Sequence, residues 1–402
     1  MSTAEANIPA KKKLNPYVYI VIMILFFMCY GNCQYKINPV LTYLMDGMGI
    51  GTDKAGLLTS SVNLLGIFIT IPLGVLMNKV GPRKMGLLGI SLVLGGSVLG
   101  TFFTSSFYMM LISQLIVGAG GAGISIACPY VIACLFVPEM RGKANGAYIM
   151  AGTLSQLLMY NLVPRIVQPT NVAPAWWFTN IWCVVMLIVW VLTITDEVAP
   201  PAGAAGQKGP SLGTTLKSLG DTKMLRFFIG GMFMMASAVA VLAMTPAYLV
   251  QAKGMDVAAA GSLVSVCALV GAICSLVGGW LSDVLHTRKW LFVICFIWMA
   301  VSRVMIALLP AGLLLNITIW LQGVPSITMG LFYTAGSDVI EKENYAMCCS
   351  VLSTGTKIGS FFGATIFGIL AASVIGYSGA YIFFAAISIV PLICMVTLKD
   401  LK

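Results

Sequence analysis

Lysine and arginine side chains occur inside the long apolar segments of this sequence, whereas acidic side chains do not. Lys36, Arg165, Arg303 and Lys357 each fall within an apolar run, and the 13 Asp and Glu residues fall in tails, in loops or in the last turn of a run. A cation held in an apolar environment is costly unless it has a partner of opposite charge. The chemistry that such a residue set offers is therefore the reversible binding of an anion.

The composition shows what kind of element must position these cations. Hydrophobic residues make up 59% of the 402 residues and charged residues only 9%, against about a quarter charged in a typical soluble domain. Apolar runs of about 20 residues, long enough to span ~30 Å of hydrocarbon, recur along the chain. Because lipid offers no partner to an open backbone, these runs are expected to be helices. Twelve spans are predicted, at about 17–44, 55–78, 84–104, 107–136, 145–166, 175–195, 224–250, 258–283, 289–310, 314–340, 345–371 and 377–398.

The loops predict the orientation and the domains. Basic residues concentrate in the tails and in alternate loops, which places both termini in the cytoplasm. The net charge of +10 is then a set of topology signals beside anionic lipid, so no nucleic-acid partner is expected. A polar stretch rich in Pro, Gly and Ala separates two six-helix bundles. The predicted parts are a tail at 1–16, a bundle at 17–195, a cytoplasmic linker at 196–222, a bundle at 223–398 and a tail at 399–402.

A short motif occurs once in each half, at a constant offset of 205 residues. Each copy has a glycine, then Asn or Asp, then an Arg-Lys pair: Gly74, Asn78, Arg83 and Lys84 in the first, Gly279, Asp283, Arg288 and Lys289 in the second. Two parallel repeats related by an axis along the membrane normal are typical of transporters that rock between two states. We expect the basic turns to pair with an acid at a neighbouring helix end and so to latch one conformation.

With these motifs, the chain resembles the major facilitator superfamily over its whole length. The resemblance implies twelve transmembrane helices in two pseudo-symmetric bundles and transport by alternating access. Two positions depart from the family motif, since Asn78 replaces an acid and Pro82 a basic residue. The resemblance also implies a monomer in the cytoplasmic (inner) membrane.

Lys357 is the cation for which a ligand role is expected. About twelve residues precede it in its span, which at ~1.5 Å each places it roughly 18 Å from the helix start. A charge at that depth costs roughly 2.5–3.5 kcal/mol and is a functional-site hypothesis by default. Gly355, Gly359 and Gly363 repeat every four residues, so a neighbouring helix can pack on their face. Lys357 would then face a central cavity.

The other three cations have alternative explanations. Arg165 precedes an outer loop, and its side chain is expected to extend to the membrane surface. Lys36 is expected to do the same or to lie at the mouth of a cavity. Arg303 is deep in its span, but the resemblance makes the ninth helix peripheral. A packing or outer-gate role is therefore favoured for Arg303, which stays a candidate for contact with the substrate.

Polar and aromatic residues on other spans could complete a binding cavity around a small carboxylate. The candidates are Gln34 and Tyr35 in the first span, Tyr130 in the fourth, Gln156 and Tyr160 in the fifth, and Gln322, Ser326 and Tyr333 in the tenth. Each of them also suits a packed core or an interfacial anchor. The 24 methionines and 11 cysteines are expected to be packing residues, and neither a metal nor a cofactor is expected.

A narrower resemblance is to the oxalate:formate antiporter group. It rests on Gln34-Tyr35, the glycine-rich segment 118–123, Phe136-x-Pro138 with Arg141-Gly142, and Lys357. The resemblance implies exchange of small carboxylates and a binding role for Lys357. That group's second cation, an arginine in the eighth helix, has no counterpart here, which favours a monoanion unless Arg303 replaces it.

Rival functions are weighed on the same residues. An enzyme would need a nucleophile with its base, paired acids or a metal set in a span, and the one histidine, His286, is in a loop. The lack of intramembrane carboxylates favours anion exchange or uniport over proton symport. The expected function is transport of a small organic anion, most simply a monocarboxylate. The alternatives are a permease for a neutral or amphipathic solute and a proton-coupled symporter or efflux carrier.

Overall fold

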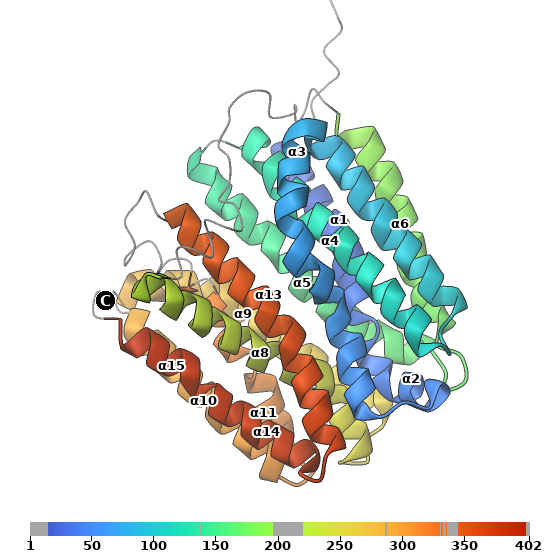
Figure 1. Cartoon of the computed structure of the whole chain (residues 1–402), viewed down its shortest axis with the longest axis vertical. Helices are drawn as coiled ribbons and strands as arrows, with labels where there is room; N and C mark the ends of the chain where they lie inside the picture. Colours follow the sequence, from blue (N-terminus) through green and yellow to red (C-terminus); the bar gives the residue numbers. More distant parts are fainter. Residues whose placement is uncertain are drawn as a thin grey trace, which may run out of the picture.

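The computed structural model describes residues 15–136, 138–195, 220–285, 288–329, 331–332, 335 and 345–398, with the side chains of some helical residues left out. Its described elements are helical throughout (Figure 1), as the apolar runs require. Nine helices in this part of the chain are long and apolar enough to cross a membrane. The prediction of an all-α membrane protein is confirmed.

The N-terminal half begins with a helix that bends before it ends. α1 stops at Tyr35 and is continued by a short 3-10 turn and a second short helix, because Pro39 cannot donate a backbone hydrogen bond. The elements of this half are α1 (Pro16–Tyr35), η1 (Asn38–Val40), α2 (Leu41–Met48), α3 (Thr52–Phe102), α4 (Phe107–Leu135), α5 (Pro138–Ile166) and α6 (Ala173–Thr193).

α3 contains the second and third predicted spans in one element. Its helical geometry is interrupted at Gly81, which has φ 82° and ψ 162°. That backbone conformation is open to glycine and strained for other residues. Pro82 follows at once, and the chain turns there within the first copy of the repeated motif.

The C-terminal half contains α8 (Thr222–Gln251), α9 (Val257–Leu285), α10 (Arg288–Leu308), α11 (Leu313–Leu321), η2 (Val324–Ser326), α13 (Tyr345–Ala372), α14 (Gly376–Ile387) and α15 (Ile389–Val396). The tenth predicted span is broken after Leu321. At this break Gly323 packs so closely on Cys267 and Gly271 of α9 that a Cβ atom would have no room. The twelfth span bends at Ser388, whose hydroxyl donates to the Phe384 carbonyl over 2.8 Å.

Each bundle buries one face of its helices and leaves the other for lipid. In α6 the exposed side chains follow helical spacing and are Trp177, Ile181, Val184, Val185 and Ile188. The opposite face is buried and carries Trp176, Thr179, Asn180, Cys183 and Trp190. Apolar side chains pointing outward and polar groups pointing inward are what a lipid environment demands.

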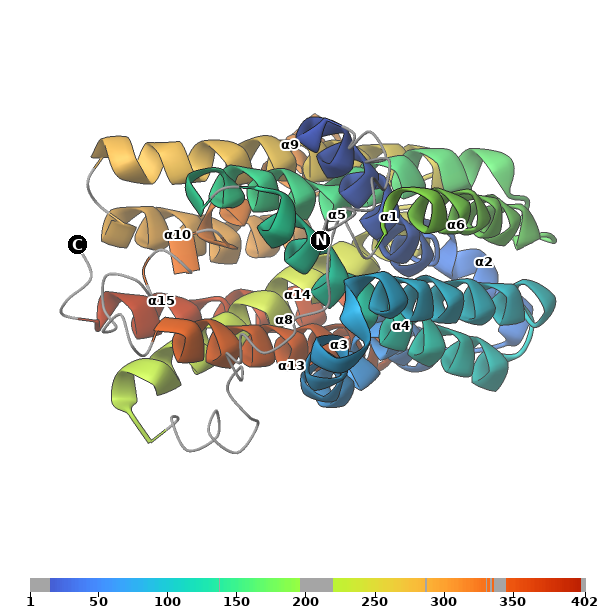
Figure 2. The ribbon, with the colours of Figure 1, turned by 90° about the horizontal axis from the view of Figure 1, so that it is seen from above.

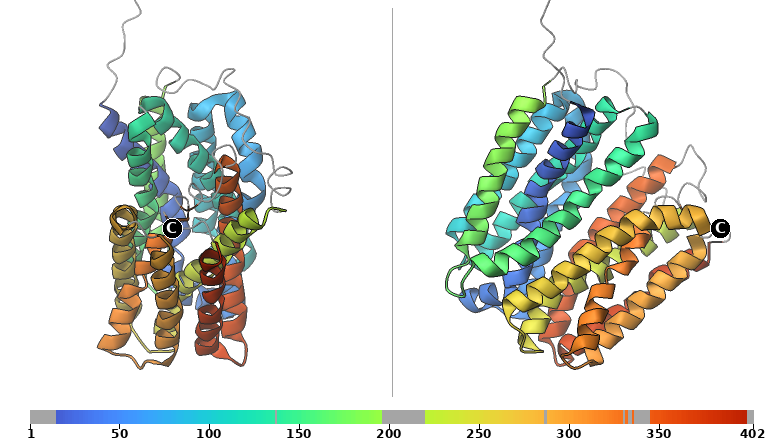
Figure 3. Two further views of the ribbon diagram at one scale, coloured as in Figure 1. Left: turned by 90° about the vertical axis from the view of Figure 1, so that its left-hand side faces the viewer. Right: turned by 180° about the vertical axis from the view of Figure 1, so that it is seen from behind.

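The two halves touch at one end and diverge at the other (Figure 3). Figure 2 shows α13 beside α3 and α9 beside α5, and these pairs make the main contacts between the halves. At the α3–α13 contact a Cβ on Gly56 would clash with the Ala364 carbonyl oxygen and lie 3.0 Å from Gly368 Cα. Nearby, the Ser60 and Thr365 hydroxyls lie 2.7 Å apart.

The glycine repeat of α13 serves the packing that the sequence predicts. A Cβ on Gly355, Gly359 or Gly363 would meet backbone carbonyls of α8, so α13 and α8 are in close backbone contact. The prediction of a close helix neighbour on this face is confirmed. Lys357 lies on another face of α13 and extends toward the N-terminal half, where its Nζ donates to Thr70 Oγ1 over 2.6 Å.

Candidate substrate site

A cavity of about 270 Å³ lies where the two halves meet, and the C-terminal half supplies most of its wall. Three lining residues come from the N-terminal half: Tyr35 on α1, and Thr153 and Gln156 on α5. The others come from α8, α9, α10 and the segment that follows α11. Its polar lining residues are Tyr35, Thr153, Gln156, Ser275, Arg303, Gln322, Ser326 and Thr328.

Arg303 is the cation of this cavity. In α10 the residues Phe292, Phe296, Met299, Arg303 and Ile306 are all buried and follow helical spacing. The other face, with Trp290, Ile294 and Leu308, is exposed. Arg303 is therefore carried inward by the apolar stripe of its own helix, and only 3% of the residue is exposed.

The guanidinium of Arg303 is only partly satisfied. Its Nη1 donates to the Met299 carbonyl over 2.5 Å, and its Nη2 donates to the Ser237 carbonyl of α8 over 3.1 Å. The buried Nε has no hydrogen-bond partner among the described residues. Both partners are neutral carbonyls, so the positive charge itself has no counter-ion in these contacts.

Two amides add further donors to the same cavity. The Nε2 atoms of Gln156 and Gln322 are buried and have no partner within the described part of the chain. The two residues come from α5 and from the end of α11, so both halves contribute a glutamine to the lining of this cavity. Among the lining residues that the structure describes there is no carboxylate. The arrangement can bind an acceptor-rich, negatively charged group.

Lys357 lies apart from this lining. It is half-buried at the contact between the halves, where Thr70 accepts its hydrogen bond. Thr70 Oγ1 in turn donates to the Gly66 carbonyl over 2.5 Å. In this conformation Lys357 joins α13 to α3, and its binding of the substrate stays a prediction.

Lys36 does not extend to the membrane surface and does not line this cavity, so both expectations for it are wrong. It is completely buried, and its Nζ donates to Ser97 Oγ over 2.7 Å and to Thr179 Oγ1 over 2.9 Å. The ammonium also lies 4.8 Å from the centre of the Trp176 ring. These neutral groups from α3 and α6 replace the water that the surface would have offered.

Arg165 is exposed at the end of α5, as its sequence position predicts. Its guanidinium donates to the Asn161 carbonyl and, over 3.2 Å, to Ser262 Oγ of α9. A cation that was expected only to reach the membrane surface thus also contributes to the contact between the halves.

The remaining candidates divide into three groups. Tyr35, Gln156, Gln322 and Ser326 line the cavity, which brings four predicted residues to one place. Tyr160 is completely buried, accepts from Asn38 Nδ2 over 3.0 Å and donates to the Leu242 carbonyl over 3.1 Å. It therefore links the halves. The half-buried Gln34 and Tyr130 are not among the lining residues, and Tyr333 lies outside the described residues.

The predicted latch falls largely outside the described side chains. Those of Gly74, Asn78, Asp283 and Arg288 are not described, so the latch stays a prediction. Arg83 is half-buried, and its backbone carbonyl accepts from Trp190 Nε1 over 3.0 Å. This bond fixes the turn after Gly81 against α6.

Sequence reasoning missed the methionines of the cavity. Met234, Met235, Met299 and Met329 line it together with Val239 and Leu242. They were expected to be packing residues. Their spacing on α8 and α10 matches that of other buried apolar residues, so the sequence carries no signal that distinguishes a cavity wall from a packed core.

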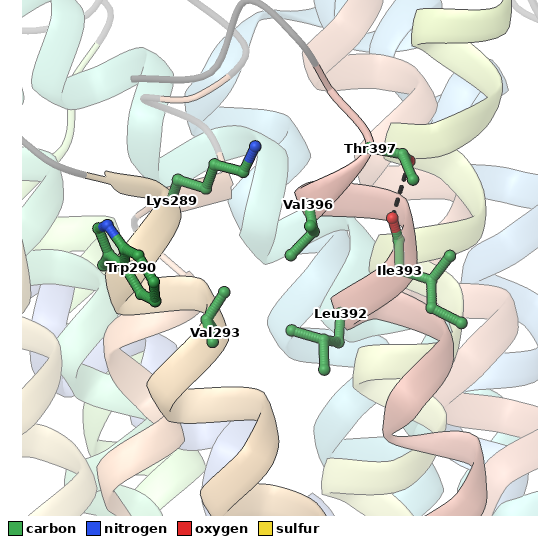
Figure 4. A pocket seen from close by; sticks show the side chains of 7 residues that line it. All are labelled: Lys289, Trp290, Val293, Leu392, Ile393, Val396 and Thr397. Carbon is green, nitrogen blue, oxygen red and sulfur yellow. Dashed lines mark hydrogen bonds between the residues drawn. The ribbon is translucent and has the colours of Figure 1, made fainter.

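A wider groove of about 700 Å³ lies between the start of α10 and the end of α15 (Figure 4). Its lining residues are Lys289, Trp290, Val293, Leu392, Ile393, Val396 and Thr397. Trp290 and Ile393 are exposed on the apolar outer face of the bundle, where lipid lies. This groove lacks converging unsatisfied donors among its described residues, and we do not assign it to the substrate.

Comparison with known proteins decides the family. The sequence profile of the Major Facilitator Superfamily matches residues 19–286 and 226–401. The chain belongs to this superfamily. It is therefore a multi-pass membrane transporter and not an enzyme.

Individual relatives are distant. Monocarboxylate transporter 9 of Gallus gallus is 23% identical over 150 residues, which are 37% of this chain and 29% of that protein. Protein spinster homolog 1 of Xenopus tropicalis is 23% identical over 209 residues, which are 51% of this chain and 39% of that protein. Each match spans well under half of the relative's own length.

Solved structures show the same fold. A bacterial homolog of the human lysosomal transporter Spinster, in an inward-facing and unoccupied conformation, has a TM-score of 0.73 at 15% identity, covering 96% of this chain and 95% of that one. A mutant of the nucleoside transporter NupG has a TM-score of 0.79 at 12% identity, covering 96% and 100%. At these identities the likeness concerns the fold alone.

Proposed function

We propose that this transporter carries a small organic anion, a monocarboxylate, across the cytoplasmic membrane by alternating access. The observation that carries the proposal is Arg303, a buried guanidinium that lines the cavity between the halves and whose Nε has no partner among the described residues. A buried cation without a counter-ion favours any state in which an anion reaches it. The substrate supplies that anion.

The lining supports an anion over a neutral solute. Gln156 and Gln322 line the same cavity, and their amide nitrogens have no partner among the described residues. The described lining contains no carboxylate to compete with the substrate. Two oxygens of a carboxylate can accept from several N–H groups at once. A neutral solute would leave the charge of Arg303 without a partner, which makes a neutral-solute permease the weaker alternative.

The position of Lys357 supports a part in the same transport cycle. It donates to Thr70 across the contact between α13 and α3, so its charge lies at a joint that must open when the halves rock. With both termini cytoplasmic, the end at which the halves touch is the outer end. The conformation would then be open toward the cytoplasm, where an arriving anion competes with Thr70 for Lys357.

Energy coupling follows from where the acids lie. The acids whose side chains the structure describes within the helical bundles and their loops, Asp46, Asp53, Asp221 and Asp256, are all exposed at or near helix ends. None of these four is placed to relay a proton through the bundle. This favours anion exchange or uniport, as in the oxalate:formate antiporter group, over a proton-coupled symporter or efflux carrier.

The relatives support the proposal only in its general form. One matched protein is named a monocarboxylate transporter and another a spinster homolog. The first name agrees with a carboxylate substrate, but the aligned part is 29% of that protein. The weight of the proposal therefore rests on Arg303 and on the Gln156 and Gln322 amides, whose nitrogens have no partner among the described residues.

The test compares acids with their amides in counterflow. Purified protein in liposomes preloaded with unlabelled butyrate is expected to accumulate labelled butyrate, whereas butyramide should neither be exchanged nor compete. The Arg303→Gln variant should lose about 10- to 150-fold in affinity, because a hydrogen bond to a charged group contributes about 1.5–3 kcal/mol. Lys54→Gln, which removes an exposed cation outside the cavity, is the matched control. Equal competition by butyramide, or an unchanged Arg303→Gln, would overturn the proposal.

A further inference from the structure

The cavity has a second property that the charge of Arg303 does not explain. Around the guanidinium the wall is apolar and rich in methionine, with Met234, Met235, Met299 and Met329 among its lining residues. We infer that the substrate is an amphipathic monocarboxylate whose apolar body packs on these methionines, rather than a small hydrophilic acid or a dicarboxylate. The inference rests on the proposed function and specifies its substrate.

The apolar wall begins directly beside the charge. Met299 lies one helical turn before Arg303 on α10, and its carbonyl accepts from Nη1. Met234 lies one turn before Ser237 on α8, and the Ser237 carbonyl accepts from Nη2. Side chains three or four residues apart lie on the same face of a helix. Because Met234 and Met299 line the same cavity as Arg303, a ligand whose carboxylate reaches Arg303 can pack its remaining atoms on them.

A dicarboxylate finds no second cation in this cavity. Arg303 is the one Lys or Arg among the described lining residues. Lys36 is enclosed by Ser97, Thr179 and Trp176, and Lys357 donates to Thr70 outside the lining. A second carboxylate would have to leave water and lie against thioether and aliphatic groups, which is costly for an ion.

The volume of the cavity limits the size of the apolar body. A cavity of about 270 Å³ favours a compact ligand, and we expect one of about the size of hexanoate or benzoate. Hexanoate has eight non-hydrogen atoms and benzoate has nine. Methionine is flexible and polarisable and adapts to irregular shapes. Linear, branched and aromatic acids of that size should therefore be accepted alike.

The test measures affinity along a series of acids. The protein in lipid nanodiscs is titrated by calorimetry with acetate, butyrate, hexanoate, octanoate and adipate, and with hexanamide, all at neutral pH. Affinity is expected to rise about fourfold per added methylene up to hexanoate and to level off by about octanoate. Adipate should bind at least tenfold more weakly than hexanoate. Empty nanodiscs of the same lipid measure the partitioning of each acid into lipid, which is subtracted.

Two methionine variants localise the effect. Met299→Ala enlarges the cavity and is expected to move the best chain length upward by about two carbons. Met186→Ala, the same change at a buried position of α6 outside the cavity, should leave the series unchanged. Met234→Ala is the second cavity variant if Met299→Ala does not fold.

The outcomes separate the two proposals. Acids that bind without any dependence on chain length, or adipate that binds as tightly as hexanoate, would overturn the amphipathic inference and leave the anion transporter intact. Hexanamide that binds as tightly as hexanoate would overturn the proposed function itself. A rise with chain length that persists in Met299→Ala without any shift would contradict the assignment of the apolar body to this wall.

Discussion

Each half of the transporter joins its first helix to its third through one buried cation, but the two cations are in opposite situations. In the N-terminal half Lys36 extends from α1 to Ser97 of α3. In the C-terminal half Arg303 extends from α10 back to the Ser237 carbonyl of α8. At the offset of 205 residues, Ser97 corresponds to Ser302, the neighbour of Arg303. The first helix carries the cation in the N-terminal half, and the third helix carries it in the C-terminal half.

The difference between the two joints shows how a repeat diverges into a structural half and a binding half. Lys36 has two hydroxyl partners and an aromatic ring, and it is completely enclosed. Arg303 has two carbonyl partners and a buried Nε without one among the described residues, and it lines a cavity. A cation whose hydrogen bonds are all made within the protein contributes to stability, whereas a cation with a free donor can still bind a ligand.

The largest effect is expected at Lys36. Lys36→Ala leaves a void and two hydroxyls, those of Ser97 and Thr179, without their donor. Such a change costs about 2–5 kcal/mol and should lower the melting temperature by roughly 2–6 °C in a fluorescence-detected unfolding assay. Acid affinity should change less than twofold. If Lys36→Ala lost much of its affinity for the acid while its stability stayed unchanged, Lys36 would not be a purely structural cation.

The next effect is expected where the halves themselves meet. Gly56→Ala places a Cβ against the Ala364 carbonyl, so α3 and α13 must separate at a cost of about 1–3 kcal/mol. Hydrogen exchange measured by mass spectrometry should increase at the start of α3 and the end of α13. Gly66→Ala is the matched control, because a Cβ there has nothing within 4 Å. Equal exchange in both variants would show that this contact does not hold the observed state.

Arg303→Lys sharpens the comparison by exchanging one kind of cation for the other. Lysine keeps the charge, but its compact ammonium lacks the fork that donates to two carbonyls and to a ligand together. Acid affinity should fall about tenfold, which corresponds to about 1.4 kcal/mol, with little change in stability. Calorimetric titration measures both wild type and variant. Full affinity in Arg303→Lys would mean that the positive charge, and not the geometry of the guanidinium, determines binding at this site.

The smallest effect concerns the cation at the moving joint. Thr70→Val removes the acceptor of Lys357, and Lys357→Met removes the donor. Each change should lower the melting temperature slightly, and a double-mutant cycle should give a coupling of about 0.5–1.5 kcal/mol. Additive effects of the two substitutions would show that this hydrogen bond contributes nothing to the closed contact.

The hydropathy pattern of the sequence was enough to predict the fold. Runs of about 20 apolar residues leave few alternatives in lipid, and the repeated motif divides the chain into halves. The break after Leu321 could not be predicted, because it depends on how closely Gly323 approaches α9. The interruption of α3 at Gly81, in contrast, lies between the second and third predicted spans, where the sequence predicts a turn.

Only part of the candidate site could be predicted from the sequence. Depth in a span identified Arg303 and Lys357 equally, and the peripheral place expected for the ninth helix weighed against Arg303. Which of the two faces a cavity depends on the direction of each side chain relative to other helices. The buried stripe from Phe292 to Ile306 does indicate the inward face of α10. Sequence alone does not tell whether that face meets a packed core or an open space.

The contact of Gly56 with Gly368 has a consequence for the energetics of rocking. At this point the two halves meet backbone to backbone. Glycine has no rotamer freedom to lose when such a contact forms and none to regain when it opens. The surface can therefore close and part without reordering side chains there. At this point of the joint, closing and opening therefore carry no cost or gain in side-chain entropy.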